Sequence, residues 1–221
     1  MALVEIREVD KAFQRDSEIV EVFTALTLDI TEGSFTALMG PSGSGKSTLL
    51  NLVAGLDRPT RGTVRVAGSE VSSMTPGQLA PWRARHVGFV FQSFHLIPSL
   101  TALENVMLPL ELAGRADARA GAREVLKQVG LESRLGHYPR QLSGGEQQRV
   151  AIARAFVTKP SVLFADEPTG NLDSATGARV IQLLFDLNRA TGTTLVLVTH
   201  DRAIAERCNR VIEMDAGRLV H

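Results

Sequence analysis

A glycine-rich segment at residues 40–48 reads GPSGSGKST and fits the pattern G-x-x-x-x-G-K-[ST]. It stands between a predicted strand and a predicted helix, which is the context that this pattern requires. Glycines let backbone N–H groups approach phosphates, Lys46 supplies a positive charge, and the Ser47 hydroxyl can bind Mg²⁺. The alternative is a glycine-rich turn without a ligand. The segment predicts a triphosphate site made of Gly40, Pro41, Ser42, Gly43, Ser44, Gly45, Lys46, Ser47 and Thr48.

Two adjacent carboxylates, Asp166 and Glu167, follow the apolar run VLFA at residues 162–165. The carboxyl ends of strands are where ligands bind in open α/β sheets. We therefore expect Asp166 to hold the magnesium ion and Glu167 to polarise the attacking water as a general base. The alternative is that one of the two carboxylates only caps the helix that follows.

The segment LSGGEQQR at residues 142–149 begins a predicted helix, and Ser143, Gly144 and Gly145 give its first turn almost no side-chain cover. Backbone N–H groups at such a terminus can meet an anion directly. Ser143 and Glu146 also form an ordinary capping box. Capping does not explain two consecutive glycines, which cost about 1 kcal/mol each relative to alanine. Since a cap uses only an oxygen lone pair, we expect the Ser143 hydroxyl proton to stay available for a phosphate.

Alternating strands and helices must position these motifs. The runs VLFA and TLVLV are apolar throughout, as is typical of parallel strands covered on both faces. Capping boxes at Thr75 and Thr101, and glycines at 114 and 130, mark helix ends. Hydrophobic patterning predicts strands at 3–9, 22–30, 34–39, 62–67, 87–91, 162–165, 194–199 and 210–214. It predicts helices at 46–54, from 75, within 101–130, and at 143–158, 174–190 and 202–208.

The pattern indicates an α/β fold with a strand-rich N-terminal part. We expect one domain over residues 1–221, with a sheet core at about 1–92 and 159–221 and a mostly helical subdomain at about 93–158. The 24 basic and 24 acidic residues balance, which argues against nucleic-acid binding through a broad basic face. Cys208 is the single cysteine, so no intramolecular disulfide can form. No apolar run reaches 18 residues and no signal peptide is evident, so we expect a cytosolic protein that reaches a membrane only through a partner.

Together the three motifs resemble those of the ATP-binding-cassette (ABC) ATPases, over essentially the whole chain. The resemblance implies a P-loop NTPase fold of the ABC type, with a mixed sheet core, an antiparallel β-rich N-terminal part and a helical subdomain. It implies ATP and Mg²⁺ as cofactors, and a head-to-tail homodimer with ATP between the phosphate loop of one chain and the LSGGEQ helix of the other.

The resemblance also implies roles for three further residues. Gln92, at the end of VGFVFQ, matches the glutamine that contacts Mg²⁺ and the water. His200, at the end of TLVLVTH, matches the histidine that contacts the γ-phosphate, although a lone histidine after a strand is by itself more often structural. Asp173, in GNLD, matches the aspartate that communicates across the dimer.

Phe13 stands where the family often has a tyrosine that stacks on adenine. A phenyl ring stacks without a hydroxyl, so the resemblance implies an adenine platform here. The alternative is that Phe13 fills the core.

The segments GFVFQSFHLIPSLTALENVMLPL and ADEPTGNLDSATG are similar to the branch of lipoprotein-release and macrolide-export ATPases (LolD and MacB types), and most similar to YbbA-like ATPases. This implies a partner permease of the FtsX or MacB kind at the inner face of the bacterial cell membrane. The apolar segment after Gln92 either receives the coupling helix of that permease or fills the helical subdomain; it comprises Phe94, Leu96, Ile97, Pro98 and Leu100.

Two other functions compete with a transporter subunit. Soluble ABC-type ATPases act on DNA or ribosomes, but they usually fuse two cassettes or insert a long coiled coil, and this chain has one cassette and no sustained heptads. A small-molecule kinase could use the same phosphate loop, but it has no use for LSGGEQ.

Overall fold

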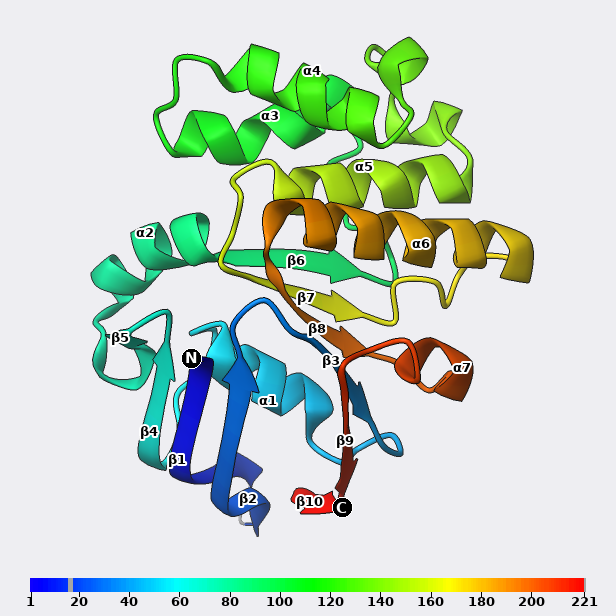
Figure 1. The fold of residues 1–221 in the computed structure, drawn as a ribbon. Helices are drawn as coiled ribbons and strands as arrows, with labels where there is room; N and C mark the ends of the chain where they lie inside the picture. The colour runs from blue at the N-terminus through cyan, green and yellow to red at the C-terminus, as the bar shows by residue number, and fades with distance from the viewer. Residues whose placement is uncertain (16–17, 221) are drawn as a thin grey trace. The chain divides into compact units, whose positions relative to one another are not determined.

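The computed structural model describes residues 1–15 and 18–220, and the chain divides into two compact units. The first unit combines Met1–Arg83 with Thr194–His221, and the second is Ala84–Thr193. Strands and helices alternate along the chain in Figure 1, as predicted for an α/β fold. Among the described residues, none of the helices has the length and apolar character needed to cross a membrane. The proposed subdomain boundaries at about 93 and 158 stay a prediction.

An antiparallel sheet with the strand order β2-β1-β4-β5 begins the first unit. Alternate residues of its long strands are buried, among them Val4 and Ile6 of β1 and Leu28 and Ile30 of β2. These residues supply the apolar face that the alternating sequence pattern predicts. The strands are β1 (Ala2–Arg15), β2 (Glu18–Thr31), β4 (Arg61–Val66) and β5 (Ser69–Glu70).

The predicted strands 3–9 and 22–30 are too short, because β1 and β2 continue to Arg15 and back from Glu18. The pairing passes through register shifts near Glu8 and Ala25, both of which have positive φ. Side chains satisfy the backbone there: Glu8 N–H donates to Thr27 Oγ1 at 3.1 Å, and Ala25 N–H donates to Asp10 Oδ1 at 2.8 Å. The irregularity breaks the simple alternation that sequence patterning detects.

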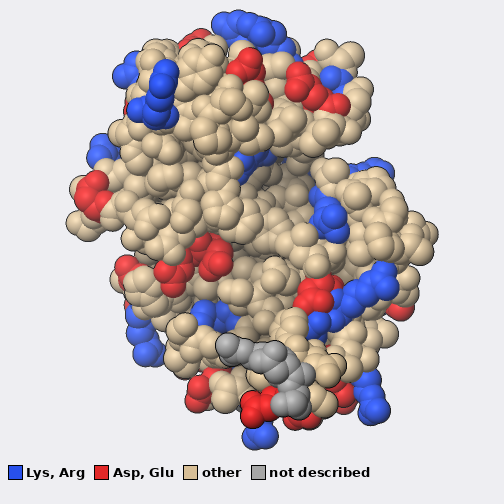
Figure 2. Space-filling view, turned by 180° about the vertical axis from the view of Figure 1, so that it is seen from behind, with Lys and Arg blue, Asp and Glu red and all other residues tan. Residues whose placement is uncertain are grey.

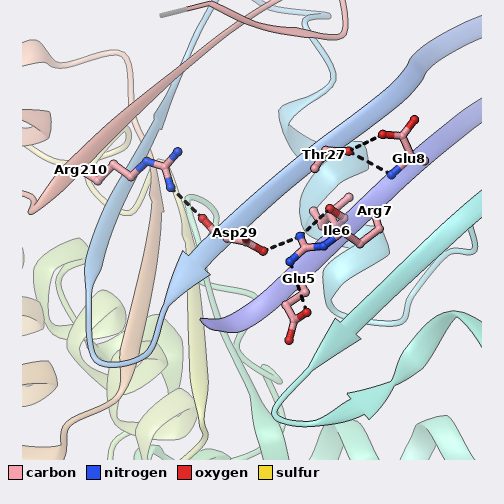
Figure 3. A network of polar contacts seen from close by, with 7 residues as sticks. All are labelled: Glu5, Ile6, Arg7, Glu8, Thr27, Asp29 and Arg210. Carbon is pink, nitrogen blue, oxygen red and sulfur yellow. Dashed lines mark hydrogen bonds and ion pairs between the residues drawn. The ribbon is translucent and has the colours of Figure 1, made fainter. Parts of the chain in front are cut away.

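A surface network ties this sheet to a strand from the far end of the chain (Figure 3). The Arg7 guanidinium bonds Asp29 Oδ1, and it also reaches Glu5 Oε2 at 3.3 Å. Arg210, in β9, donates to the backbone oxygen of Asp29 at 2.8 Å. Exposed ion pairs contribute little stability singly, but this network links β1, β2 and β9.

Parallel strands carry the phosphate loop in the first unit. Strand β3 (Phe35–Met39) pairs in parallel with β8 (Thr194–Val198) and with β9 (Arg210–Asp215). Every residue of β8 is buried, as its apolar run predicts. The hairpin partner β10 (Arg218–Val220) and strand β5 were not predicted. The remaining elements are α1 (Lys46–Val53), η1 (Val71–Ser73) and α7 (Arg202–Ala205), and α2 (Pro76–His86), whose last residues belong to the second unit.

The predicted helix at 202–208 is wrong in length, because α7 is a single turn. After it, Arg207 N–H bonds Ile204 O and Cys208 N–H bonds Ala205 O, so the chain tightens into turns. Asn209 then pairs with Phe35, by N–H to O at 2.8 Å and through its side chain to Phe35 N–H at 2.8 Å. These tertiary bonds end the helix.

The second unit holds the parallel strand pair β6 (Val87–Phe91) and β7 (Val162–Asp166). The predicted helical stretch 101–130 is two helices, each followed by a glycine with φ near +70°, Gly114 and Gly130. In Figure 1, α3 lies beside α4 and α5, in agreement with their contacts. The helices are α3 (Ala102–Leu112), α4 (Ala118–Gln128), α5 (Gly144–Phe156), α6 (Ser174–Thr191), η2 (Glu132–Arg134) and η3 (Pro139–Gln141).

Candidate functional site

The phosphate loop connects β3 to α1 in the first unit, and glycine is required at two of its positions. Gly40 has φ +145°, and a Cβ there would lie 2.1 Å from the backbone oxygen of Met214. Gly45 has φ +101°, and a Cβ there would lie 2.6 Å from a ring carbon of Phe23. The loop therefore needs glycine for its backbone conformation and for its packing on neighbouring elements.

The N-terminus of α1 is built for an anion. Its N-cap is Gly45, without a side-chain cap, and its first turn contains no acidic residue. Lys46 Nζ lies over the loop and donates to Gly40 O at 2.9 Å, Pro41 O at 2.7 Å and Ser44 Oγ at 3.3 Å. Ser47 is exposed in the first turn. Helix N–H groups, one ammonium and one hydroxyl are a donor set that fits the phosphates of ATP with Mg²⁺.

Phe13 lies on β1 with 42% of its surface exposed, so the core-filling alternative is wrong. Below the ring, the ammonium of Lys11 lies 4.4 Å from the ring centroid. Lys11 is itself buried, and its Nζ bonds Asp57 Oδ1 at 2.7 Å and Arg58 O at 2.9 Å. A supported and accessible aromatic ring is what stacking on a base requires; the stacking itself stays a prediction.

Asp166 ends β7, and Glu167 follows it with φ +44°. Left-handed backbone at a non-glycine residue costs about 1–3 kcal/mol and is concentrated at functional sites. Both side chains are half-buried. Neither caps the next helix, because Asp173 is the N-cap of α6 and accepts from Thr176 N–H at 2.9 Å. The capping alternative for these two carboxylates is therefore wrong.

Gln92 follows β6 in the same unit and lies against the turn after β7. Its Nε2 donates to Asn171 Oδ1 at 3.1 Å, and Asn171 Nδ2 donates to Gln92 O at 3.1 Å. The buried side chain of Gln148, in α5, donates to Phe91 O at 3.3 Å and to Pro168 O at 2.7 Å. One buried amide thus ties the backbone before Gln92 to the backbone after Glu167. Sequence reasoning missed both Asn171 and Gln148.

The N-terminus of α5 carries a complete capping box. Ser143 Oγ accepts from Glu146 N–H at 3.3 Å, and Glu146 Oε2 accepts from Ser143 N–H at 2.8 Å. Ser143 Oγ also donates to Glu146 Oε2 at 3.0 Å, so the expectation of an available hydroxyl proton is wrong here. Arg134 Nε bonds the other carboxylate oxygen, Oε1, at 2.9 Å. The Ser143 backbone N–H, followed by Arg134, lowers the pKa of the Glu146 carboxyl from 4.5 to about 2.

The glycine argument for this segment also needs correction. A Cβ on Gly145 would lie 2.5 Å from Thr176 Cγ2 of α6, and a Cβ on Gly144 would lie 3.3 Å from Leu172 Cδ2. Close packing therefore accounts for Gly145 without any phosphate.

A pocket of about 430 Å³ lies between the starts of α5 and α6. It brings together four predicted residues, Ser143, Gly144, Gly145 and Asp173, and its lining includes Arg149 and Arg179. The backbone N–H of Thr176 lowers the pKa of the Asp173 carboxyl. The two guanidinium groups of the lining favour an anion, whereas the carboxylates of Glu146 and Asp173 in the same lining oppose one.

His200 is exposed two residues after the end of β8, in the first unit. Thr199 Oγ1 before it accepts from Asp201 N–H at 3.0 Å, and Asp201 caps α7 through Ala203 N–H at 2.8 Å. These bonds fix the backbone on both sides of the imidazole.

The segment after Gln92 has an unusual backbone. Phe94 and His95 both have positive φ, +58° and +49°. Arg154 of α5 donates to both of their carbonyl oxygens, at 3.0 Å and 2.6 Å, and its burial lowers its pKa. Asn105 of α3 bonds both N–H and O of Ile97. Arg154 and Asn105 therefore hold the segment on the helices, while Pro98 stays exposed.

The sequence and the fold of the chain are similar to those of ABC transporter proteins. A family profile described as ABC transporter matches residues 23–170. The ABC transporter ATP-binding protein YbbA of Escherichia coli K12 is 52% identical over 98% of this chain and 96% of its own length. The lipoprotein-releasing system ATP-binding protein LolD of Geobacter metallireducens is 49% identical over 99% and 98%. The dimeric structure of the ATP-binding cassette MJ0796 bound to ADP and Pi has a TM-score of 0.90 and 44% identity, covering 99% and 97% of the two chains.

Proposed function

This chain belongs to the ABC transporter family: it is an ATP-binding subunit and an ATPase that uses ATP and Mg²⁺. On that basis we propose which of its residues perform hydrolysis and which partner they drive. The observation that carries the proposal is the α1 N-terminus, which has a glycine cap, no acid in its first turn and Lys46 over the loop.

Lys46 exchanges its three bonds to the loop for bonds to the β- and γ-phosphates, and the N–H groups of α1 bind the same phosphates. Ser47, Asp166 and Gln92 hold Mg²⁺, which neutralises phosphate charge when it is bound. Phe13 supports the adenine ring from the side opposite Lys11.

Glu167 accepts a proton from the attacking water, and His200 contacts the γ-phosphate. The strained backbone of Glu167 supports this role, because such strain persists only where the surroundings impose it. Gln148 supports it too, since it holds Pro168 O next to Glu167 and Phe91 O next to Gln92. A carboxylate with a fixed backbone is well placed for general base catalysis.

A second copy of the chain supplies the other half of the nucleotide site. In this proposal, Ser143, Gly144 and Gly145 of α5 face the phosphates bound by the partner copy, and Asp173 communicates across the dimer. The MJ0796 cassette is dimeric with ADP and Pi, which supports the same arrangement here. ATP binding then closes the homodimer, and hydrolysis opens it.

The driven partner is an integral membrane permease of the FtsX or MacB kind, at the inner face of the cell membrane. Similarity to the LolD of a lipoprotein-releasing system supports this class of partner. On the face shown in Figure 2, basic and acidic side chains are interspersed. With a net charge of zero, this distribution disfavours the alternative of a cassette that acts on DNA or ribosomes.

Affinity purification of the tagged chain from detergent-solubilised membranes tests the partner. We expect a multi-span permease with a large extracytoplasmic part, bound in stoichiometric amounts. The Arg154→Met variant releases the carbonyls of Phe94 and His95. It should retain less permease, because the segment after Gln92 is proposed to receive the coupling helix. Recovery of ribosomes or DNA in place of a membrane protein would contradict the proposal.

A further inference from the structure

The Gln92 side chain packs against the turn after β7, within the second unit; the residues that contact it, Gly170 and Asn171, are called its seat below. Its side-chain Nε2 donates to Asn171 Oδ1, and Asn171 Nδ2 donates back to the Gln92 backbone oxygen, both at 3.1 Å. The side chain and the backbone of Gln92 are therefore both bound to one residue, 79 positions further along the chain.

Gly170 forms the floor of the seat. A Cβ on Gly170 would lie 2.6 Å from Gln92 Nε2, 2.9 Å from its Cδ and 3.2 Å from its Cγ. The backbone of Gly170 is not among the positive-φ glycines, so its conformation is open to any residue. Glycine is needed at this position for the close approach of the Gln92 side chain, and any larger residue would displace the amide.

The buried side of the seat is rigid. Gln148 is fully buried, and its single amide nitrogen bonds Phe91 O and Pro168 O, one on each side of the seat. Phe91 precedes Gln92, and Pro168 lies two residues before Gly170. The two backbone segments are thus fixed to each other, and the exposed Asn171 side chain completes the seat.

The hydrogen bonds determine which end of the Gln92 side-chain amide stays available for a metal ion. A backbone carbonyl can only accept, so Asn171 must direct its NH₂ group to Gln92 O. Its oxygen then meets the Gln92 side chain, and only the NH₂ end of that side chain can donate to an oxygen. Gln92 Oε1 remains, and an amide oxygen is the kind of ligand that Mg²⁺ binds.

We propose that Asn171 and Gly170 are positioning residues that orient the Gln92 amide so that its oxygen is presented to Mg²⁺. The inference rests on the proposed function of Gln92 as a magnesium ligand. Asn171 also lines the pocket at the start of α5, but in this account both residues act on the metal only through Gln92.

Calorimetric titration of ATP, with and without Mg²⁺, measures the effect as a binding affinity and does not depend on the rate of hydrolysis. The background is Glu167→Gln, in which the proposed base is absent. Asn171→Ala should leave the affinity for metal-free ATP unchanged. It should lower the gain in ATP affinity on adding Mg²⁺ (the magnesium gain) by about threefold to tenfold, the range of one hydrogen bond. Gly170→Ala should lower the gain at least as much. Gly136→Ala is the matched control, since its Cβ would meet no atom within 4 Å.

A fourth variant, Gln92→Ala, separates the inference from the proposed function. A reduced gain in Gln92→Ala together with wild-type gains in Asn171→Ala and Gly170→Ala would overturn the inference and leave the role of Gln92 standing. An unchanged gain in Gln92→Ala would overturn that role and the inference with it. The melting temperatures of the same samples should not differ. A purely structural role for Asn171 and Gly170 would lower the melting temperature and leave the effect of Mg²⁺ on ATP affinity unchanged.

Discussion

Two helix N-termini are proposed to meet the same phosphates, and they are built in opposite ways. The N-terminus of α1 has a glycine cap, no first-turn acid and a lysine folded over the loop. The N-terminus of α5 has a complete capping box, the carboxylate of Glu146 in its first turn and the guanidinium of Arg134 on that carboxylate. The first is suited to bind an anion within one chain, because it has neither a side-chain cap nor a first-turn acid among the described residues to compete for its N–H groups.

The second helix terminus is already satisfied by its own residues. Ser143 accepts from and donates to Glu146, so its hydroxyl must exchange one partner to reach a phosphate. A carboxylate in the first turn also repels a polyanion. This difference supports the proposal that α1 binds phosphates within one chain, whereas α5 contributes only when another copy brings a phosphate to it.

The largest effect is expected for a variant that blocks the chemical step and leaves both helix N-termini able to contact the phosphates. Glu167→Gln should slow hydrolysis by about 10²–10⁴-fold, the usual effect of losing a general base. ATP binding should survive, because the amide keeps the shape of the carboxylate. Size-exclusion chromatography with ATP should then show a stable dimer. Near-normal phosphate release by this variant would remove Glu167 from the role.

The next effect separates capping from phosphate contact at α5. Ser143→Asp alone would place two carboxylates together, since Ser143 Oγ lies 3.0 Å from Glu146 Oε2. The variant should therefore be made with Glu146→Gln, which keeps a capping box. The pair should keep the melting temperature of Glu146→Gln alone and keep monomeric ATP binding, but it should lose dimerisation, with about 10²–10³-fold less turnover, as when one transition-state donor is removed.

Glu146→Gln alone is the control for that pair, and it should dimerise and turn over ATP. Wild-type turnover in the double variant would mean that Ser143 is a cap and nothing more. The N-terminus of α5 would then have no role in binding phosphate, and it would differ from the N-terminus of α1 in function as well as in structure.

A smaller effect belongs to the first helix terminus and its aromatic neighbour. Phe13→Ala should weaken ATP binding by about 1–3 kcal/mol, the range for an aromatic ring stacked on a base. Phe13→Tyr should be nearly neutral, because the ring face is kept. Nucleotide titration measures both variants. A lower melting temperature with unchanged affinity in Phe13→Ala would contradict a platform on β1.

The smallest effect concerns the charge of Glu146. Its pKa is lowered from 4.5 to about 2 in the folded chain, so its charge stabilises the fold above pH 4.5, and this contribution is lost as the pH falls towards 2. Glu146→Gln should therefore flatten the decline of melting temperature between these pH values by a few degrees, roughly the effect of 1 kcal/mol or less. An identical pH profile in both proteins would show that the ion pair with Arg134 contributes nothing.

The predictable part of the molecule is the part that local sequence controls. The pattern around Lys46 marks a strand, a loop and a helix start within a few residues, and the structure has β3, the loop and α1 there. The buried run of β7 and the capping box at Ser143 are local in the same sense.

The missed parts depend on contacts between distant residues. Asn171 reaches Gln92 across 79 positions and Gln148 reaches Phe91 across 57, and neither residue type signals that partner. The single turn of α7 follows from Asn209 pairing with Phe35, 174 positions away. The hydroxyl of Ser143 was misjudged because the capping box was treated as one bond, whereas Glu146 uses both its backbone N–H and its carboxylate.

Mixing two inactive variants tests the central claim, that one copy's phosphate loop and the other copy's α5 share a nucleotide. Lys46→Ala disables every phosphate loop, and Ser143→Asp with Glu146→Gln disables every α5 terminus. In a mixed head-to-tail dimer both lesions fall in one site and the other site is intact. An equal mixture should therefore recover turnover, up to about a quarter of wild type for a two-fold dimer. A mixture no more active than its two separate components would contradict the shared site.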